Sequence, residues 1–221
     1  MQKQYASQVY SDRLVSLINN RFTEADGSLK LLSAKEANSY IEEFGRINFI
    51  VWCYEQAIYT LPTVELVDWL KTQINDPKDT LEICSGNNGL SDLLGITGVD
   101  SRAQNIYRKE YKRISQATTD PPDNIVNMDA IEAVIKFKPN LVIASWATQE
   151  WDGTHGFERG VKETIILNST DKYIHIGNEG IHGEKKIRRV PHQALRFDWL
   201  VTRSQHPQKN CIYIWKGGKI A

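Results

Sequence analysis

The sequence predicts an α/β fold with a mostly parallel sheet, and three observations carry that prediction. From Asp79 onward, short apolar runs alternate with stretches of helical spacing. A glycine-rich loop follows the first run, as in sheets that bind a nucleotide at the carboxyl ends of their strands. The last two apolar runs are separated by the turn-rich SQHPQKN, which predicts an antiparallel hairpin.

Residues 1–75 are expected to form a helical extension, and residues 76–221 one compact α/β domain. Residues 34–59 contain no proline and have apolar residues at helical spacing, with Ser33 and Glu36 as a capping box at the start. Pro62 is expected at an early position of the next helix. Apolar residues share one face in the first and last helices of this extension: Val9, Leu14, Leu17 and Ile18, then Val64, Val67, Leu70 and Ile74.

Five strands are expected in the α/β domain, at residues 80–83, 96–99, 124–127, 141–144 and 173–176. Helices are expected between them at residues 90–94, 102–114, 130–137 and 156–167. The closing hairpin is expected to pair residues 199–202 with residues 211–215, which completes a seven-stranded sheet.

Composition excludes several classes of protein. The chain has 221 residues, enough for one sizeable core, and its 27 basic and 27 acidic residues argue against a general polyanion binder. Cys53, Cys84 and Cys211 lie far apart, and no histidine has a partner at ligand spacing, so no metal is expected. No apolar run approaches the roughly 20 residues that span a bilayer, and the start has no signal-peptide core. We therefore expect a cytoplasmic protein that does not enter a membrane.

Residues 81–100, LEICSGNNGLSDLLGITGVD, contain the most informative motif. Glu82 lies near the end of one strand, a glycine-rich loop and a short helix follow, and Asp100 ends the next strand. Gly86 and Gly89 allow a close approach of the backbone, and an acid at the end of the second strand can accept both hydroxyls of a ribose. The pattern indicates a nucleotide-like ligand.

In this motif the sequence resembles the class I S-adenosylmethionine-dependent methyltransferases, whose first motif is an acid followed by a GxGxG-type loop. Asp100 matches their ribose-binding acid, and Asp129 with Ala130 matches the pair that meets adenine. Residues 61–215 look more closely like an uncharacterised bacterial and phage group of methyltransferase-like proteins, through LPTVELVDWL, MDAIEAV, PNLVIASWAT and YIHIGNEGIH. The resemblance implies a Rossmann-like methyltransferase fold and S-adenosylmethionine as cofactor. It implies cofactor contacts by Glu82, Cys84, Ser85, Gly86, Asn88, Gly89, Asp100, Ser101, Asp129, Ala130, Ser145 and Trp146.

Two residues depart from that family's loop. Asn88 replaces one glycine, a mild change because asparagine tolerates a positive φ. Cys84 replaces another, and it puts a side chain where the family leaves room for the methionine part of the cofactor. The alternative is therefore a catalytically inactive module that keeps the fold to bind a protein or a nucleic acid. A nicotinamide dehydrogenase fits less well, because it would need GxGxxG with an acid about 20 residues further on.

The acceptor site is expected after the fourth strand, where residues 145–151 read SWATQEW. The D/N-P-P-aromatic loop of amino-group methyltransferases is missing there, and the DPPD at residues 120–123 is expected to be an ordinary turn. Trp146 is expected to line the pocket, whereas Trp151 fits a stacking role and a cover for the sheet edge equally well. The expected roof of the pocket consists of aromatic residues from the extension: Tyr10, Trp52, Tyr54 and Tyr59.

Glu179 and His182, after the fifth strand, are the candidate catalytic bases. A single histidine in a loop is more often structural, and that alternative stays open for His182. Basic clusters at residues 102–113 and 184–189 fit a nucleic-acid acceptor or solvated surfaces, and we favour the latter because acidic residues at 120–132 offset them. The acceptor, a small molecule or a macromolecule, is left open.

Overall fold

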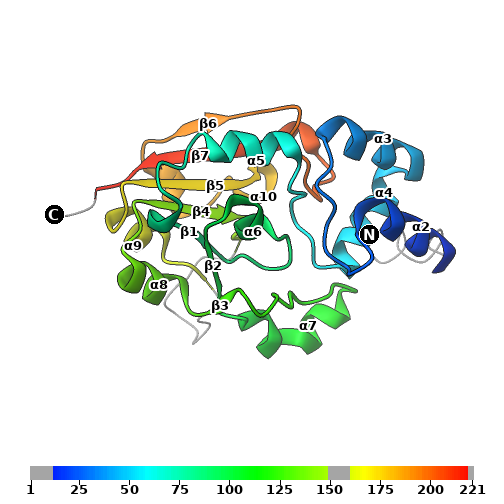
Figure 1. Ribbon diagram of the computed structural model, residues 1–221, viewed down its shortest axis with the longest axis horizontal. Helices are drawn as coiled ribbons and strands as arrows, with labels where there is room; N and C mark the ends of the chain where they lie inside the picture. The colour runs from blue at the N-terminus through cyan, green and yellow to red at the C-terminus, as the bar shows by residue number, and fades with distance from the viewer. Residues whose placement is uncertain (1–11, 149–159, 219–221) are drawn as a thin grey trace.

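A computed structural model describes residues 12–148 and 160–218. Its core is a seven-stranded sheet in the order β3-β2-β1-β4-β5-β7-β6 (Figure 1). The strands are β1 (Thr80–Ile83), β2 (Thr97–Asp100), β3 (Val126–Asn127), β4 (Leu141–Ser145), β5 (Lys172–Asn178), β6 (Gln193–Leu195) and β7 (Asn210–Lys216). Neighbouring strands are parallel except where β7 pairs antiparallel with β5 and β6. This confirms the expected α/β fold, a mostly parallel seven-stranded sheet with an antiparallel C-terminal hairpin.

Helices cover both faces of the sheet, which is why all residues of β1 and β4 are buried. The α-helices are α2 (Asp12–Phe22), α3 (Ala34–Phe44), α4 (Arg46–Glu55), α5 (Val64–Lys71), α6 (Leu90–Leu94), α7 (Arg108–Arg113), α8 (Ala130–Phe137), α9 (Glu163–Asn168) and α10 (Glu179–His182). Short 3-10 helices are η1 (Pro77–Asp79), η2 (Ala103–Tyr107), η3 (Lys186–Arg189) and η4 (Pro207–Lys209). Val142 packs with α8 and α9 on one face, and its neighbour Ile143 packs with α5 and α6 on the other.

The N-terminal helices α2, α3 and α4 have an apolar core of their own, centred on Phe22, Phe49 and Trp52. The capping box of Ser33 and Glu36 is confirmed at the start of α3. The prediction of one helix over residues 34–59 is wrong, because Gly45 has a φ of 83° and separates α3 from α4. Glycine adopts a positive φ without steric cost, so the chain can change direction here.

Helix α5 packs on the sheet, with Leu66, Val67 and Leu70 in the same apolar cluster as Ile143. It begins after Thr63, whose hydroxyl accepts a hydrogen bond from the Leu66 N–H at 3.3 Å. Pro62 therefore precedes the N-cap, and its predicted place inside the helix is wrong. The division at residue 75 stays a prediction, but the apolar core of the extension ends before α5.

The predicted partner of β7 is wrong: β6 comprises residues 193–195, and residues 199–202 form no strand. This apolar segment pairs instead with the end of the N-terminal extension. The Leu61 N–H donates to the Val201 carbonyl at 3.0 Å, and the Arg203 N–H donates to the Tyr59 carbonyl at 3.1 Å. Residues 200 and 201 are thus buried between the sheet and the extension rather than in the hairpin.

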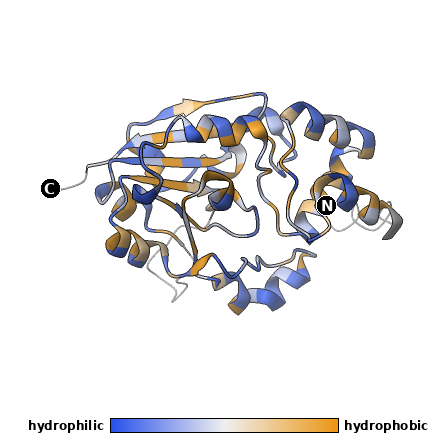
Figure 2. Cartoon of the chain, viewed as in Figure 1, coloured by the Kyte–Doolittle hydropathy of each residue, from blue (hydrophilic) through white to orange (hydrophobic). Residues whose placement is uncertain are grey.

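The remaining predicted elements agree with the structure in part. The bounds of β1, α6 and α8 are as predicted, whereas β3 is shorter and residues 102–114 divide into η2 and α7. The helix predicted over residues 156–167 begins only at Glu163, and its first four positions lie outside the described residues. Figure 2 shows hydrophobic residues among the central strands, while α7 is mostly hydrophilic. None of the described helices has the length and apolar character that crossing a membrane requires.

Candidate functional site

A cavity of about 460 Å³ opens at the carboxyl ends of β1, β2 and β4. Its wall combines the loop after β1, Asp100, residues 145–148 after β4, the segment from Ala103 to Thr119, and Ala57 and Tyr59 of the extension. Pockets for small ligands typically measure about 300–1,000 Å³. The cavity therefore has the position and size of a ligand site.

The loop after β1 has left-handed backbone at Cys84 (φ 54°), Gly86 (φ 54°) and Gly89 (φ 66°). Asn88 is not left-handed; its Oδ1 accepts a hydrogen bond from the N–H of Leu90, the first residue of α6, at 3.2 Å. A Cβ at Gly86 would lie 3.2 Å from Cγ2 of Thr119, so the loop is closely packed there. The positive φ that the sequence made acceptable at Asn88 is found at Cys84 instead.

Asp100 lies in the cavity wall and is tied to this loop. Its Oδ2 accepts from the Gly86 N–H at 3.1 Å, and its Oδ1 accepts from the Arg102 N–H at 2.7 Å. Burial raises the pKa of this carboxyl group, and the two backbone hydrogen bonds oppose the shift. Because a carboxylate has about four acceptor positions, each oxygen can accept a further hydrogen bond from a ligand.

Glu82 lies beneath the loop and does not line the cavity. It is fully buried, its Oε2 accepts from the Ser91 N–H of α6 at 3.0 Å, and burial raises its pKa to about 8. Its carboxyl group thus connects β1 to the start of α6. Ser85 lines the cavity but directs its hydroxyl to the carbonyls of Glu82 and Val99.

Four other expected cofactor contacts, Gly89, Ser101, Asp129 and Ala130, also lie outside the cavity wall. Asp129 caps α8 by accepting from the Ile131 N–H at 2.8 Å. Ala130 is buried in the core of the sheet domain, and Ser101 is exposed. The cavity is formed without them.

The end of β4 brings Ser145 and Trp146 to the cavity, as the sequence predicted. The Ser145 Oγ is buried and has no hydrogen-bond partner among the described atoms. Trp146 has a φ of 61° and packs edge-on against His182, with ring centroids 4.9 Å apart. Trp151 lies outside the described residues. Non-glycine residues with positive φ concentrate at functional sites, and both Cys84 and Trp146 line this cavity.

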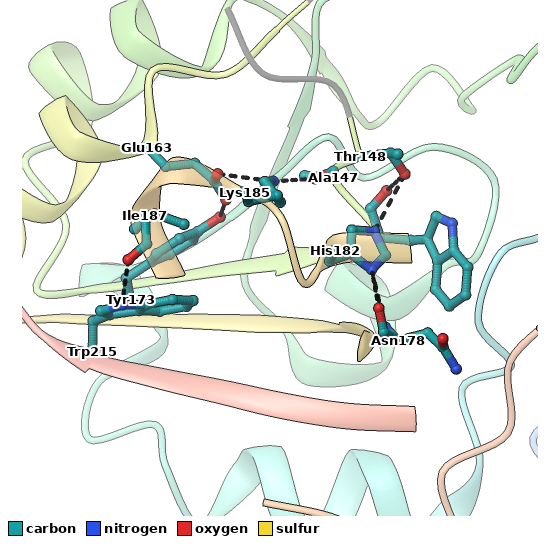
Figure 3. A network of polar contacts seen from close by, with 10 residues as sticks. Ala147, Thr148, Glu163, Tyr173, Asn178, His182, Lys185, Ile187 and Trp215 are labelled. Carbon is teal, nitrogen blue, oxygen red and sulfur yellow. Dashed lines mark hydrogen bonds and ion pairs between the residues drawn. The ribbon is translucent and has the colours of Figure 1, made fainter. Parts of the chain in front are cut away.

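Neither candidate base lines the cavity. His182 is fully buried behind Trp146, where its Nε2 lies 3.3 Å from the Thr148 Oγ1 and its Nδ1 lies 3.0 Å from the Asn178 N (Figure 3). Burial lowers its pKa to about 3, so its imidazole is neutral. Glu179 is half-exposed and pairs with Arg196 at 2.8 Å, which lowers its pKa. The structure places His182 as a support for Thr148, which does line the cavity.

A buried ion pair supports the same wall (Figure 3). The Lys185 Nζ lies 2.8 Å from a Glu163 oxygen and also donates to the Ala147 carbonyl in the cavity wall. The Tyr173 hydroxyl donates to the other Glu163 oxygen at 2.7 Å. The sequence places Lys185 in a solvated basic cluster, and no local signal distinguishes it from its exposed neighbour Lys186.

Of the four aromatic residues expected in the roof, Tyr59 lines the cavity. Its hydroxyl accepts from the Gln116 Nε2 at 2.8 Å and from the Gln104 Nε2 at 3.3 Å. Trp52 is buried in the core of the extension, Tyr54 is absent from the cavity wall, and Tyr10 lies outside the described residues. Gln104, Gln116, Thr119 and Arg203 also line the cavity, and no sequence motif marks them.

Comparison with known proteins shows a likeness to a solved structure. No protein-family model and no curated protein sequence matches the chain. Among solved structures, the chain is similar to the crystal structure of a triple mutant of DNMT2 from Spodoptera frugiperda, with 12% sequence identity and a TM-score of 0.33. The match covers 64% of this chain and 50% of that one, so the chain spans about half the length of that protein. The expected kinship with a bacterial and phage group stays a prediction.

Proposed function

We propose that the chain is an S-adenosylmethionine-dependent methyltransferase whose cofactor lies in the cavity at the carboxyl ends of β1, β2 and β4. The observation that carries the proposal is the cavity wall itself, in which the left-handed loop at Gly86 is hydrogen bonded to Asp100. Cys84 lines a cavity of about 460 Å³ and does not fill it. The open space supports cofactor binding over a catalytically inactive module in which Cys84 would block the cofactor.

The cofactor would supply a methyl group on a positively charged sulfur. Toward it, Asp100 has free acceptor positions for the ribose hydroxyls, and Gly86 lets the loop backbone come close. Ser145 and Trp146 form the wall on which the acceptor would be held. Much of the rate of such a transfer comes from placing the acceptor against the sulfur.

Calorimetry with S-adenosylmethionine and S-adenosylhomocysteine tests the proposal. The parent protein should bind both, and Asp100→Ala should weaken binding more than about tenfold, roughly 1.4 kcal/mol, because a charged hydrogen-bond acceptor is lost. Asp92→Ala is the matched control, since Asp92 is an exposed carboxylate of α6 that bonds to Asn124. No heat from the parent protein at millimolar ligand would contradict the proposal.

A second candidate is a module of the same fold that binds without catalysis. The observation that favours it is the position of Glu179 and His182 outside the cavity wall. This candidate predicts that ligand binds in the cavity while S-adenosylmethionine is never consumed. Production of S-adenosylhomocysteine with any acceptor, small molecule, protein or nucleic acid, would eliminate it.

A further inference from the structure

Arg203 presents a guanidinium group in the part of the cavity wall that the extension completes. Its Cζ lies 3.6 Å from the ring centroid of Tyr59 and 4.6 Å from that of Tyr54. The backbone N–H of Arg203 also donates to the Tyr59 carbonyl at 3.1 Å. Two aromatic faces and a backbone hydrogen bond therefore hold this cation in place.

The charge of Arg203 has no counter-ion among the described residues. No described Asp or Glu oxygen lies within 4.0 Å of its guanidinium, and its Nη1 is buried without a hydrogen-bond partner. Two other inward-facing cations are satisfied: Lys185 pairs with Glu163, and Arg46 donates to the Thr202 and Ser204 carbonyls. Arg203 is partly buried, and burying a charge without a counter-ion is costly, so the cavity that it lines is suited to a ligand that supplies an anion.

Two further polar residues, Gln104 and Thr119, line the cavity with Arg203. Gln104 accepts from the Thr119 N–H at 2.9 Å through its Oε1, which fixes its amide so that its Nε2 donates to the Tyr59 hydroxyl. Thr119 in turn holds a buried Oγ1 without a partner among the described atoms. Arg203 and Thr119, connected through Tyr59 and Gln104, line the same cavity.

We propose that Arg203 binds an oxyanion, a carboxylate or a phosphate, that belongs to the methyl acceptor. The inference rests on the proposed function and narrows its substrate class to anionic molecules. A guanidinium matches both oxyanions through paired N–H···O hydrogen bonds. Asp100 is assigned to the cofactor and repels an anion, so the acceptor's charged group is placed at Arg203 instead.

Nitrogen-15 NMR of the arginine side chains tests this site directly. The Nε–H signal of Arg203, assigned with Arg203→Lys, is followed while inorganic phosphate or acetate is added to the protein with S-adenosylhomocysteine present. A saturable shift at about millimolar concentration with one of the two probes is expected, and the probe that acts distinguishes a phosphate from a carboxylate. Absence of a shift with both probes overturns the proposal.

Arg188 is the internal control, because it also lies over a tyrosine ring, 3.9 Å from the Tyr213 centroid, and has buried nitrogens without a partner. It does not line the cavity, so its signal should stay fixed. Equal shifts of both signals would indicate nonspecific anion binding and overturn the proposal.

The cofactor's own carboxylate is the competing occupant. If S-adenosylhomocysteine alone shifts the Arg203 signal and abolishes the response to both probes, the acceptor assignment is wrong. Calorimetry gives a second readout: Arg203→Met should weaken S-adenosylhomocysteine binding less than threefold, and a tenfold loss would assign Arg203 to the cofactor. If S-adenosylhomocysteine does not bind at all, the proposed function fails. Titrating the free protein with phosphate and acetate then still tests whether Arg203 binds an anion.

Discussion

Glu82 is an acid enclosed between β1 and the start of α6, and its pKa of about 8 makes it a protonated group in the folded protein at neutral pH. In the unfolded chain it ionises near its ordinary value of 4.5. The folded state therefore binds more protons between these two values, and stability decreases as pH rises through that window.

Replacing Glu82 with glutamine should remove this pH dependence, because the amide resembles the protonated acid and does not ionise. Between pH 5 and 8, the free energy of unfolding of Glu82→Gln should rise relative to the parent by up to about 1.4 kcal/mol per pH unit. Urea denaturation of both proteins at several pH values measures it. A difference that stays constant with pH would contradict a protonated Glu82.

Residues at the ends of strands were predicted as site residues, whereas residues that long-range contacts bring to the cavity were missed. Asp100, Gly86 and Trp146 follow strand ends, so the topology of a parallel sheet places them at one edge. Arg203 and Gln116 reach the cavity only through contacts between segments far apart in the chain, and such contacts leave no local pattern. Glu179 and His182 follow β5 but turn away from the cavity, which strand order does not determine.

Helix α9, strand β5 and the segment before η3 meet at the buried pair of Lys185 and Glu163. Lys185→Met would leave the Glu163 charge buried without its partner, and the expected loss of stability is about 3–5 kcal/mol. Urea unfolding measures it, and the double variant with Glu163→Gln should recover much of the loss. Lys71→Met, at an exposed lysine of α5, is the control and should change stability by less than about 0.5 kcal/mol.

Elements with local signals were predicted well, and those defined by distant partners were not. The bounds of β1 and α8 follow from apolar runs and from Asp129, a typical N-cap. Residues 199–202 have the composition of a strand, but their apolar side chains contact the N-terminal extension instead of continuing the hairpin. Composition alone does not distinguish an apolar strand of a sheet from an apolar segment buried against another part of the chain.

The extension and the sheet domain are joined where Arg46 donates to the Thr202 carbonyl at 2.8 Å and to the Ser204 carbonyl. Arg46→Met should lower the stability of this junction by about 1.5–3 kcal/mol, because charged hydrogen bonds are lost. Hydrogen exchange should show faster exchange at the amides of Leu61 and Arg203, while the Ile143 amide in β4 is unchanged.

The control for this junction is Arg21→Met, which removes an exposed ion pair with Glu43 of 3.7 Å and should have little effect. Equal acceleration of exchange in β4 and at the junction would show that Arg46 stabilises the whole molecule rather than the junction.

The antiparallel bridge between Thr60 and Thr202 has a consequence for how the protein is made. During synthesis the extension, the loop after β1 and the end of β4 are all completed well before residue 203. The nascent chain therefore carries every other described part of the cavity wall before Arg203 is added. A ligand that needs Arg203 is therefore unable to assist the early folding of the chain. A premature stop before residue 200 would remove β7 and the cavity's cation together, so a truncated product would lack both the last central strand and the anion site.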